Sequence, residues 1–255
     1  MSVFISFSGD QARAALRLFH AKGNIITSET IEALRSGIES VSQNPQVKLV
    51  TIEGTGDDFS FGASIPEHAP DQIGRVLPQM HRLIEDLLEL HAPSAAIVRG
   101  RCLGGGFELA LACDFIFAAD DAVFGLPEIA LGVFPPAAAA LLPLRVGASR
   151  AARAILAGDL RPATVWKDAG ILELVAPARL LSAAVDEWFE RHLAPKSAAA
   201  LRHAATAART SLVAHVQSVL PRLERLYLEE LMRTHDAAEG IDAFIHKRSP
   251  NWLDR

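Results

Sequence analysis

The sequence predicts an α/β protein whose mostly parallel strands are joined by helices, with a helical region at the C-terminal end. Two patterns support this class. Short apolar runs typical of β-strands alternate with stretches in which apolar residues recur at every third or fourth position, the spacing of one helix face. From residue 196 onward the pattern is helical. A chain of 255 residues is near the upper limit for one hydrophobic core, so we expect one large domain with an appendage.

The individual elements follow a β-β-α-β order at first, and strand–helix alternation then repeats. In chain order we expect strands at 3–7 and 14–19, a helix at 28–42, a strand at 47–53, a helix at 73–91, and strands at 95–98, 115–118 and 123–124. Beyond Arg150 helical patterns dominate, apart from a short apolar run at 171–175. The alanine-rich stretches at 137–140 and 198–208 are typical of closely packed helices.

Composition and charge argue against several classes of protein. Lys and Arg number 25 against 30 Asp and Glu, and this net charge of −5 disfavours a nucleic-acid-binding protein. The N-terminus has no basic leader, and no apolar run reaches the ~18 residues of a membrane span. Cys102 and Cys113 fit neither a zinc pattern nor a disulfide framework. We therefore expect a soluble cytoplasmic protein with no metal site.

The most informative segment, residues 99–114, contains three consecutive glycines at 104–106. A helix is expected to begin at these glycines, and the free N–H groups of a helix start can stabilise an anion. The spacing fits neither a dinucleotide-binding nor a phosphate-binding loop. Gly105 can offer its N–H to an oxyanion, and Glu108 lies on the same helix face as a candidate acid or base. Alternatively, Glu108 only complements the helix dipole.

Two other segments carry candidate site residues. Glu128 follows a proline in an apolar run, where burial would raise the pKa of its carboxyl and suit it to act as an acid; alternatively, it is an ordinary glutamate at a helix start. Residues 59–66 can present another backbone N–H, or they form a surface loop closed by Pro66. By sequence spacing, His68 and His81 have no carboxylate partner, so we expect solvent-facing or core positions for both.

Four separate motifs, in order along nearly the whole chain, resemble the enoyl-CoA hydratase/isomerase (crotonase) family. They are Phe61-Gly-Ala-Ser-Ile, Gly-Gly-Gly-x-Glu at 104–108, Gly125-x-Pro-Glu-Ile-x-Leu-Gly and Glu239-Gly-Ile-Asp-Ala-Phe-Ile-His-Lys-Arg. The resemblance implies a crotonase-like spiral of ββα units with an acyl-CoA site over residues 1–195. It also implies a C-terminal helical trimerisation region over residues 196–255, and hence a homotrimer or homohexamer.

The same resemblance implies roles for individual residues. The oxyanion hole falls on the backbone N–H groups of Ala63 and Gly105, and the two glutamates of the hydratases correspond to Glu108 and Glu128. Coenzyme A enters as part of the substrate, with no separate cofactor required. The implied substrate or CoA contacts are Gly62, Ala63, Ser64, Ile65, Pro66, Gly104, Gly105, Phe134 and Lys247. Lys247 can act from a neighbouring subunit, or it is merely a solvated cation.

The presence of both glutamates favours an enzyme that hydrates a conjugated enoyl thioester. The runs at 59–68 and 133–138 look similar to family members that act on a cyclic dienoyl thioester, with Phe134 and residues 137–140 as walls for a flat ring. This similarity implies conversion of cyclohexa-1,5-diene-1-carbonyl-CoA to 6-hydroxycyclohex-1-ene-1-carbonyl-CoA. The alternatives are a generic short-chain enoyl-CoA hydratase, an enoyl-CoA isomerase, or a non-catalytic acyl-CoA-binding scaffold.

Overall fold

The main sheet of the protein has six strands. The structure, a computed structural model, describes residues 2–255, so Met1 of the expected core region lies outside it. In spatial order the strands are β1 (Val3–Phe7), β2 (Arg13–Leu18), β3 (Leu49–Gly54), β4 (Ser94–Val98), β6 (Phe115–Ala119) and β9 (Leu174–Ala176). β1 and β2 are antiparallel, and the other neighbouring pairs are parallel, as expected.

A second sheet lies beside the first and consists of β5 (Arg101–Leu103), β7 (Val123–Gly125) and β8 (Arg161–Pro162). β4 passes through a turn into β5 and then into helix α3 (Gly105–Ala112); β6 passes into β7 and, after a loop, into α4 (Pro136–Val146). These two stretches are the strand–strand–helix units that the resemblance implied. β5 and β8 were not predicted from the sequence, because a strand of two or three residues is too short to show an alternating pattern.

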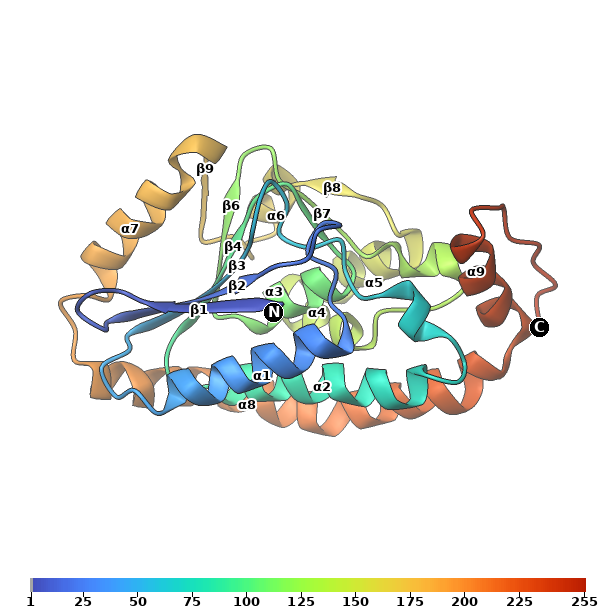
Figure 1. Ribbon diagram of the computed structural model, residues 1–255, viewed down its shortest axis with the longest axis horizontal. Helices are drawn as coiled ribbons and strands as arrows, with labels where there is room; N and C mark the ends of the chain where they lie inside the picture. The colour runs from blue at the N-terminus through green and yellow to red at the C-terminus, as the bar shows by residue number, and fades with distance from the viewer. Residues whose placement is uncertain (1) are drawn as a thin grey trace.

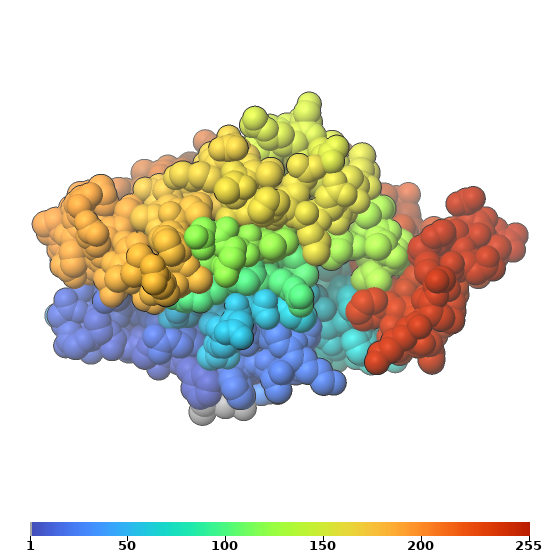
Figure 2. Space-filling view, turned by 90° about the horizontal axis from the view of Figure 1, so that it is seen from above, coloured from blue at the N-terminus to red at the C-terminus, as the bar shows by residue number. Residues whose placement is uncertain are grey.

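The other helices cover the sheets and form one end of the molecule. They are α1 (Ser28–Ser42), α2 (Ile73–Glu89), α5 (Ala148–Ala157), α6 (Ala163–Asp168), α7 (Leu181–His192), α8 (Ala198–Arg225) and α9 (His235–Ile245). α1, α2 and α8 run side by side along the main sheet, whereas α9 and the last residues project at one end (Figures 1 and 2). α1 begins where predicted because the Thr27 hydroxyl accepts the Thr30 N–H.

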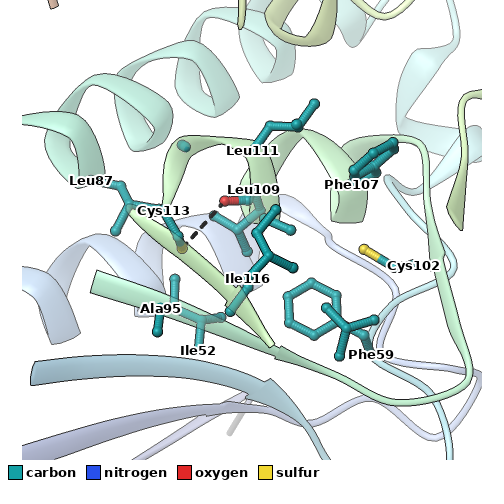
Figure 3. Close-up of a cluster of buried hydrophobic side chains, with 14 of the residues drawn as sticks. Ile52, Phe59, Leu87, Ala95, Cys102, Phe107, Leu109, Leu111, Cys113 and Ile116 are labelled. Atoms are coloured by element: carbon teal, nitrogen blue, oxygen red, sulfur yellow. Dashed lines mark hydrogen bonds between the residues drawn. The ribbon is translucent and has the colours of Figure 1, made fainter. Parts of the chain in front are cut away.

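The hydrophobic core lies between the main sheet and its covering helices. Figure 3 shows part of it, with aliphatic and aromatic side chains from β3, α2, α3, β4 and β6 meeting in one cluster. Cys102 and Cys113 both point into this cluster as free, fully buried thiols, and their sulfur atoms lie apart from each other. Both cysteines therefore act as small apolar core residues, and burial raises the pKa of each thiol.

A buried arginine fastens the long helix α8 to the core. The Arg209 side chain is 3% exposed; its Nε donates to Asp114 Oδ1 at 2.7 Å and its Nη2 pairs with Asp114 Oδ2. The same guanidinium donates to the carbonyls of Leu90, just after α2, and Ala92, just before β4. One side chain thus joins α8 to the end of α2 and to the starts of β4 and β6.

The expected boundary near residue 196 falls in the turn between α7 and α8. α8 packs back on α2 and α4, so the expected C-terminal region contributes to the same hydrophobic core as the rest of the chain. The division into a core and an oligomerisation region stays a prediction. Within residues 2–255, no helix is both long and apolar enough to cross a membrane.

Substitution of Arg209 tests how firmly α8 depends on this clamp. Arg209→Met keeps the aliphatic stem but removes the charged partner of Asp114, which keeps only its hydrogen bonds from Ser94, and leaves three backbone carbonyls without the guanidinium donor. We expect a loss of about 3–5 kcal/mol in the free energy of unfolding, measured by urea denaturation. Arg191→Met, which removes an exposed pair with Glu187 on α7, is the control and should change stability by about 0.5 kcal/mol or less. Equal losses of stability for the two variants would contradict the conclusion that Arg209 fastens α8 to the core.

Candidate active site

Most of the predicted site residues meet at one narrow cavity of about 80 Å³. It lies between α2, α3 and the start of α4, and is closed by the short helices η1 (Ile65–His68) and η2 (Pro127–Leu131) and by the π-helix η4 (Leu226–Glu230) that continues α8. From the predicted set it is lined by Gly62, Ala63, Ile65, Gly104, Gly105, Glu108, Glu128 and Phe134. Ser64 and Pro66 adjoin these residues in the chain but do not line the cavity.

Two glycines allow two backbone segments to come close at this cavity. Gly62 has φ +101° and Gly104 has φ +50°, conformations that side chains with a Cβ rarely adopt. A Cβ on Gly62 would lie 2.9 Å from the Leu103 carbonyl oxygen, and a Cβ on Gly104 would lie 2.6 Å from Glu128 Oε1. The glycines are therefore required both by the turn of the chain and by the space around it.

The amide groups of Ala63 and Gly105 face each other across this approach. A Cβ on Gly105 would lie 3.3 Å from the Ala63 nitrogen, so the two segments are in contact there. The Ala63 N–H takes no part in the bridge to Ile26, which uses the Gly62 carbonyl and the Ser64 N–H. The Gly105 N–H is at the first position of α3, where a helix has no internal acceptor. Two backbone N–H groups without an acceptor in the described structure therefore lie close together at the cavity.

Glu108 lies on the first turn of α3 and is 6% exposed. Its Oε1 accepts the backbone N–H of Ala138, in the first turn of α4, at 2.8 Å. Burial is the largest influence and raises the pKa of the carboxyl, while the bond from Ala138 opposes that rise. The arrangement gives Glu108 one donor with which to hold a negative charge.

Glu128 lies on η2, directly after Pro127, and faces the same cavity. Its Oε2 is buried and has no hydrogen-bond partner among the described residues. Burial, together with the nearby Glu108 carboxyl, raises the pKa of Glu128 to about 8. Glu128 therefore keeps its proton at neutral pH, next to a second buried carboxyl whose pKa is also raised.

The expected alanine wall at 137–140 is wrong. The cavity is lined by Phe134, Pro135 and Pro136, whereas Ala137, Ala138 and Ala140 are buried in the core. The reason is the direction of α4: its N-terminal end meets Glu108, so the backbone amide of Ala138 faces the carboxyl while the alanine methyl groups pack elsewhere.

The expectation that His81 has no carboxylate partner is also wrong. Its Nδ1 lies 2.6 Å from Oε2 of Glu224 on α8, and its buried Nε2 has no partner in the described structure. The nearby His81 lowers the pKa of Glu108. The contact joins residues 143 positions apart, which sequence spacing cannot indicate. His68 lines the cavity, its Nδ1 contacts the Ser64 carbonyl at 2.9 Å, and burial lowers its pKa.

One titratable residue of the cavity lining was not predicted from the sequence, and one predicted residue lies away from the cavity. Tyr227 on η4 lines the cavity, and its hydroxyl is buried without a partner. Lys247 follows α9, is exposed, and does not line the cavity, so its contact with a CoA phosphate stays a prediction. Across residues 2–255, no three His, Cys, Asp or Glu side chains gather closely enough to hold a metal ion.

Comparisons with known proteins identify the family and the fold of the chain. The family model described as "Enoyl-CoA hydratase/isomerase" matches residues 14–255. The chain is 42% identical over 255 residues to a cyclohexa-1,5-dienecarbonyl-CoA hydratase from Thauera aromatica, covering 100% of this chain and 97% of that protein. It is 33% identical over 237 residues to a 2,3-dehydroadipyl-CoA hydratase from Escherichia coli K12, covering 92% of each. The crystal structure of an enoyl-CoA hydratase from Mycobacterium avium subsp. paratuberculosis K-10 superimposes with TM-score 0.87, at 29% identity, over 100% of this chain and 99% of that one.

The raised pKa of Glu128 predicts how stability depends on pH. The folded protein keeps this proton up to about pH 8, whereas an unfolded chain releases it near pH 4.5. Above pH 5 the unfolded state therefore binds fewer protons, and the free energy of unfolding falls as pH rises toward 8, by at most about 1.4 kcal/mol per pH unit.

Glu128→Gln removes this titration, so the variant should gain stability relative to the parent between pH 5.5 and 8.5 in urea denaturation. Glu187→Gln, on the exposed surface of α7, serves as the matched control and should follow the parent. A constant difference between Glu128→Gln and the parent at all pH values would contradict the placement of the proton.

Proposed function

The chain belongs to the enoyl-CoA hydratase/isomerase family, and from this premise we propose that it hydrates cyclohexa-1,5-diene-1-carbonyl-CoA to 6-hydroxycyclohex-1-ene-1-carbonyl-CoA. Family membership itself makes the protein a crotonase-fold enzyme of the hydro-lyase class that acts on CoA thioesters. The observation that carries the proposal is the pair of buried carboxyls, Glu108 and Glu128, beside two free backbone donors.

The backbone donors stabilise the charge that develops on the thioester. When water attacks Cβ of a conjugated thioester, electrons move onto the carbonyl oxygen. The N–H groups of Ala63 and Gly105 bind that oxygen, and each such donor contributes about 3–4 kcal/mol to the stability of the transition state. Both donors belong to rigid backbone and are oriented before the substrate arrives.

The two carboxyls then carry the protons. One carboxylate accepts a proton as the water oxygen bonds to Cβ, and one carboxyl gives a proton to the extended enolate. Each transfer accelerates the reaction by about 10²–10⁴-fold. We assign Glu128, whose pKa is raised to about 8, as the proton donor and Glu108 as the base. Glu108 takes one proton from the water and Glu128 gives one to the enolate. The starting states return when Glu108 passes its proton to Glu128, so the net change is the addition of one OH and one H.

A cyclic dienoyl substrate requires protonation beyond Cα. The proton is added at the far end of the diene, three bonds along the ring from the attacked Cβ, so the acid and the base must reach opposite edges of a flat ring. The full-length similarity to the Thauera aromatica enzyme supports the same substrate class.

Further properties belong to the same proposal. We also propose CoA contacts at Ser64, Pro66 and Lys247, as expected of a member of this family. For the same reason we propose a homotrimer or homohexamer formed through residues 196–255. Exposed apolar side chains on and after α9, Phe244 and Trp252 among them, support a subunit contact there. Placement in the cytoplasm stays a prediction from the sequence.

Substitution of each glutamate tests the assigned chemistry. Glu108→Gln and Glu128→Gln keep the size of the side chain but cannot exchange a proton, so each should lower kcat by about 10²–10⁴-fold while KM stays within a few-fold. Steady-state kinetics and oligomer mass are to be measured together. Glu190→Gln, on the exposed face of α7, should retain parental rates. Unchanged rates in both active-site variants would remove the proposed mechanism.

A substrate panel separates the proposed reaction from its alternatives. Purified protein is given cyclohexa-1,5-diene-1-carbonyl-CoA and crotonyl-CoA, and the products are analysed by mass spectrometry. We expect faster turnover of the cyclic diene, with a gain of one water. Rapid hydration of crotonyl-CoA alone would indicate a short-chain hydratase, a double-bond shift without change of mass would indicate an isomerase, and tight binding without turnover would indicate a scaffold.

A further inference from the structure

One buried hydroxyl in the cavity has no role in the chemistry described above. Tyr227 is 1% exposed, yet its hydroxyl has no hydrogen-bond partner in the described structure. Leaving a buried hydroxyl unpaired costs about 1–3 kcal/mol, so a folded protein rarely keeps one unless a bound molecule completes it. The phenol lines the same cavity as the two glutamates.

The polar groups of the cavity separate into satisfied and unsatisfied ones. Its titratable side chains are His68, Glu108, Glu128 and Tyr227. His68 Nδ1 contacts the Ser64 carbonyl, and Glu108 accepts the Ala138 N–H. His81, held by Glu224, is buried nearby and acts on Glu108. Two atoms of the cavity lining have no partner, Glu128 Oε2 and the Tyr227 hydroxyl, and the buried Nε2 of His81, outside this lining, also has none. After burial, Glu128 is the group that raises the phenol pKa most.

The Tyr227 ring is held firmly in place. Its edge packs against the Phe134 ring, with 5.5 Å between centroids, and it belongs to a small apolar cluster with Ile73, Leu77 and Val133. The backbone beneath it is the π-helix η4, a rare turn that is frequent at functional sites. A fixed ring with a free hydroxyl is the arrangement expected of a binding group rather than of a core residue.

A single oxygen atom bound in the cavity is a candidate partner for both unpaired groups, Glu128 Oε2 and the Tyr227 hydroxyl. They face one cavity and do not bond to each other, and a buried water needs two to four polar partners and roughly 15 Å³ of the cavity, which holds about 80 Å³. A phenol both donates and accepts, so it serves a water or a hydroxyl equally well.

We propose that Tyr227 is a further catalytic residue, whose hydroxyl, together with Glu128, binds the oxygen atom that the enzyme adds to the acyl group. This oxygen is the attacking water in one direction and the product hydroxyl in the other. The inference rests on the proposed function, because it assigns to hydration chemistry a group that hydration by two glutamates and two amides leaves unused.

Tyr227→Phe removes one oxygen atom and keeps the ring. We expect kcat/KM to fall by the same factor, about 10- to 100-fold, in hydration and dehydration, because the reaction equilibrium is unchanged. The midpoint of thermal unfolding should stay the same or rise, since an unpaired buried hydroxyl is removed. Lower activity with undiminished stability distinguishes a binding role from a structural one, and unchanged kcat/KM would overturn the proposal.

Ligand binding tests the contact without turnover. In the Glu108→Gln background, the dissociation constant of 6-hydroxycyclohex-1-ene-1-carbonyl-CoA should rise about 2- to 10-fold on adding Tyr227→Phe. Cyclohexane-1-carbonyl-CoA, which lacks the hydroxyl, should bind both variants within twofold. Equal changes for the two ligands would assign Tyr227 to general packing. A parent protein that hydrates neither crotonyl-CoA nor the cyclic diene would instead overturn the proposed function.

Tyr227 is the single tyrosine of the chain, which permits a measurement on the otherwise unsubstituted protein. Incorporation of 3-fluorotyrosine gives one fluorine resonance, from the residue in question. We expect this resonance to shift when 6-hydroxycyclohex-1-ene-1-carbonyl-CoA is added, and to shift less with cyclohexane-1-carbonyl-CoA. The same resonance with both ligands would contradict the contact even if Tyr227→Phe failed to fold.

Discussion

The contact between two backbone segments, at Gly62 on one side and at Gly104 and Gly105 on the other, is the constraint on which the rest of the site depends. Two backbone segments can approach this closely only where no Cβ lies between them. The alignment of the two segments is set two residues before the glycines, where Ser60 forms a β-bridge with Cys102 of β5. Because β5 continues directly from β4, the position of the two amides is fixed by the main sheet itself.

This rigid frame makes it possible to bury two carboxyl groups in an apolar cavity. Desolvation favours the protonated form of both groups, and each carboxylate disfavours the other. Two contacts make the pair unequal: Ala138 donates to Glu108 and His81 lowers its pKa, whereas Glu128 Oε2 has no partner. The difference between the two carboxyls thus depends on where α4 begins and on how α8 holds His81, and strongly shifted carboxyls of this kind are typical of functional sites.

Much of the fold was predictable from local patterns, because β2 and α1 each bury one regular face and α1 begins at a clear N-cap signal, Thr27. The motif residues around Glu108 and Glu128 were predictable for the same reason: they are contiguous in the chain. β5 and β8 were missed because they are held by their neighbours rather than by a periodic pattern of their own. Glu224 and Tyr227 were missed because they reach the site through the packing of α8, which no local sequence pattern encodes.

The C-terminal helix has a consequence for how proteins of this fold can diverge. Arg209 fixes α8 to the core, and further along the same helix Glu224 pairs with the histidine near Glu108 while Tyr227 enters the cavity wall. Residues 196–255 are therefore not an exchangeable module. A chimera that joined residues 1–195 to the tail of a relative would have a different cavity wall and a different electrostatic neighbour for Glu108, so the tail and the cavity are expected to evolve together rather than independently.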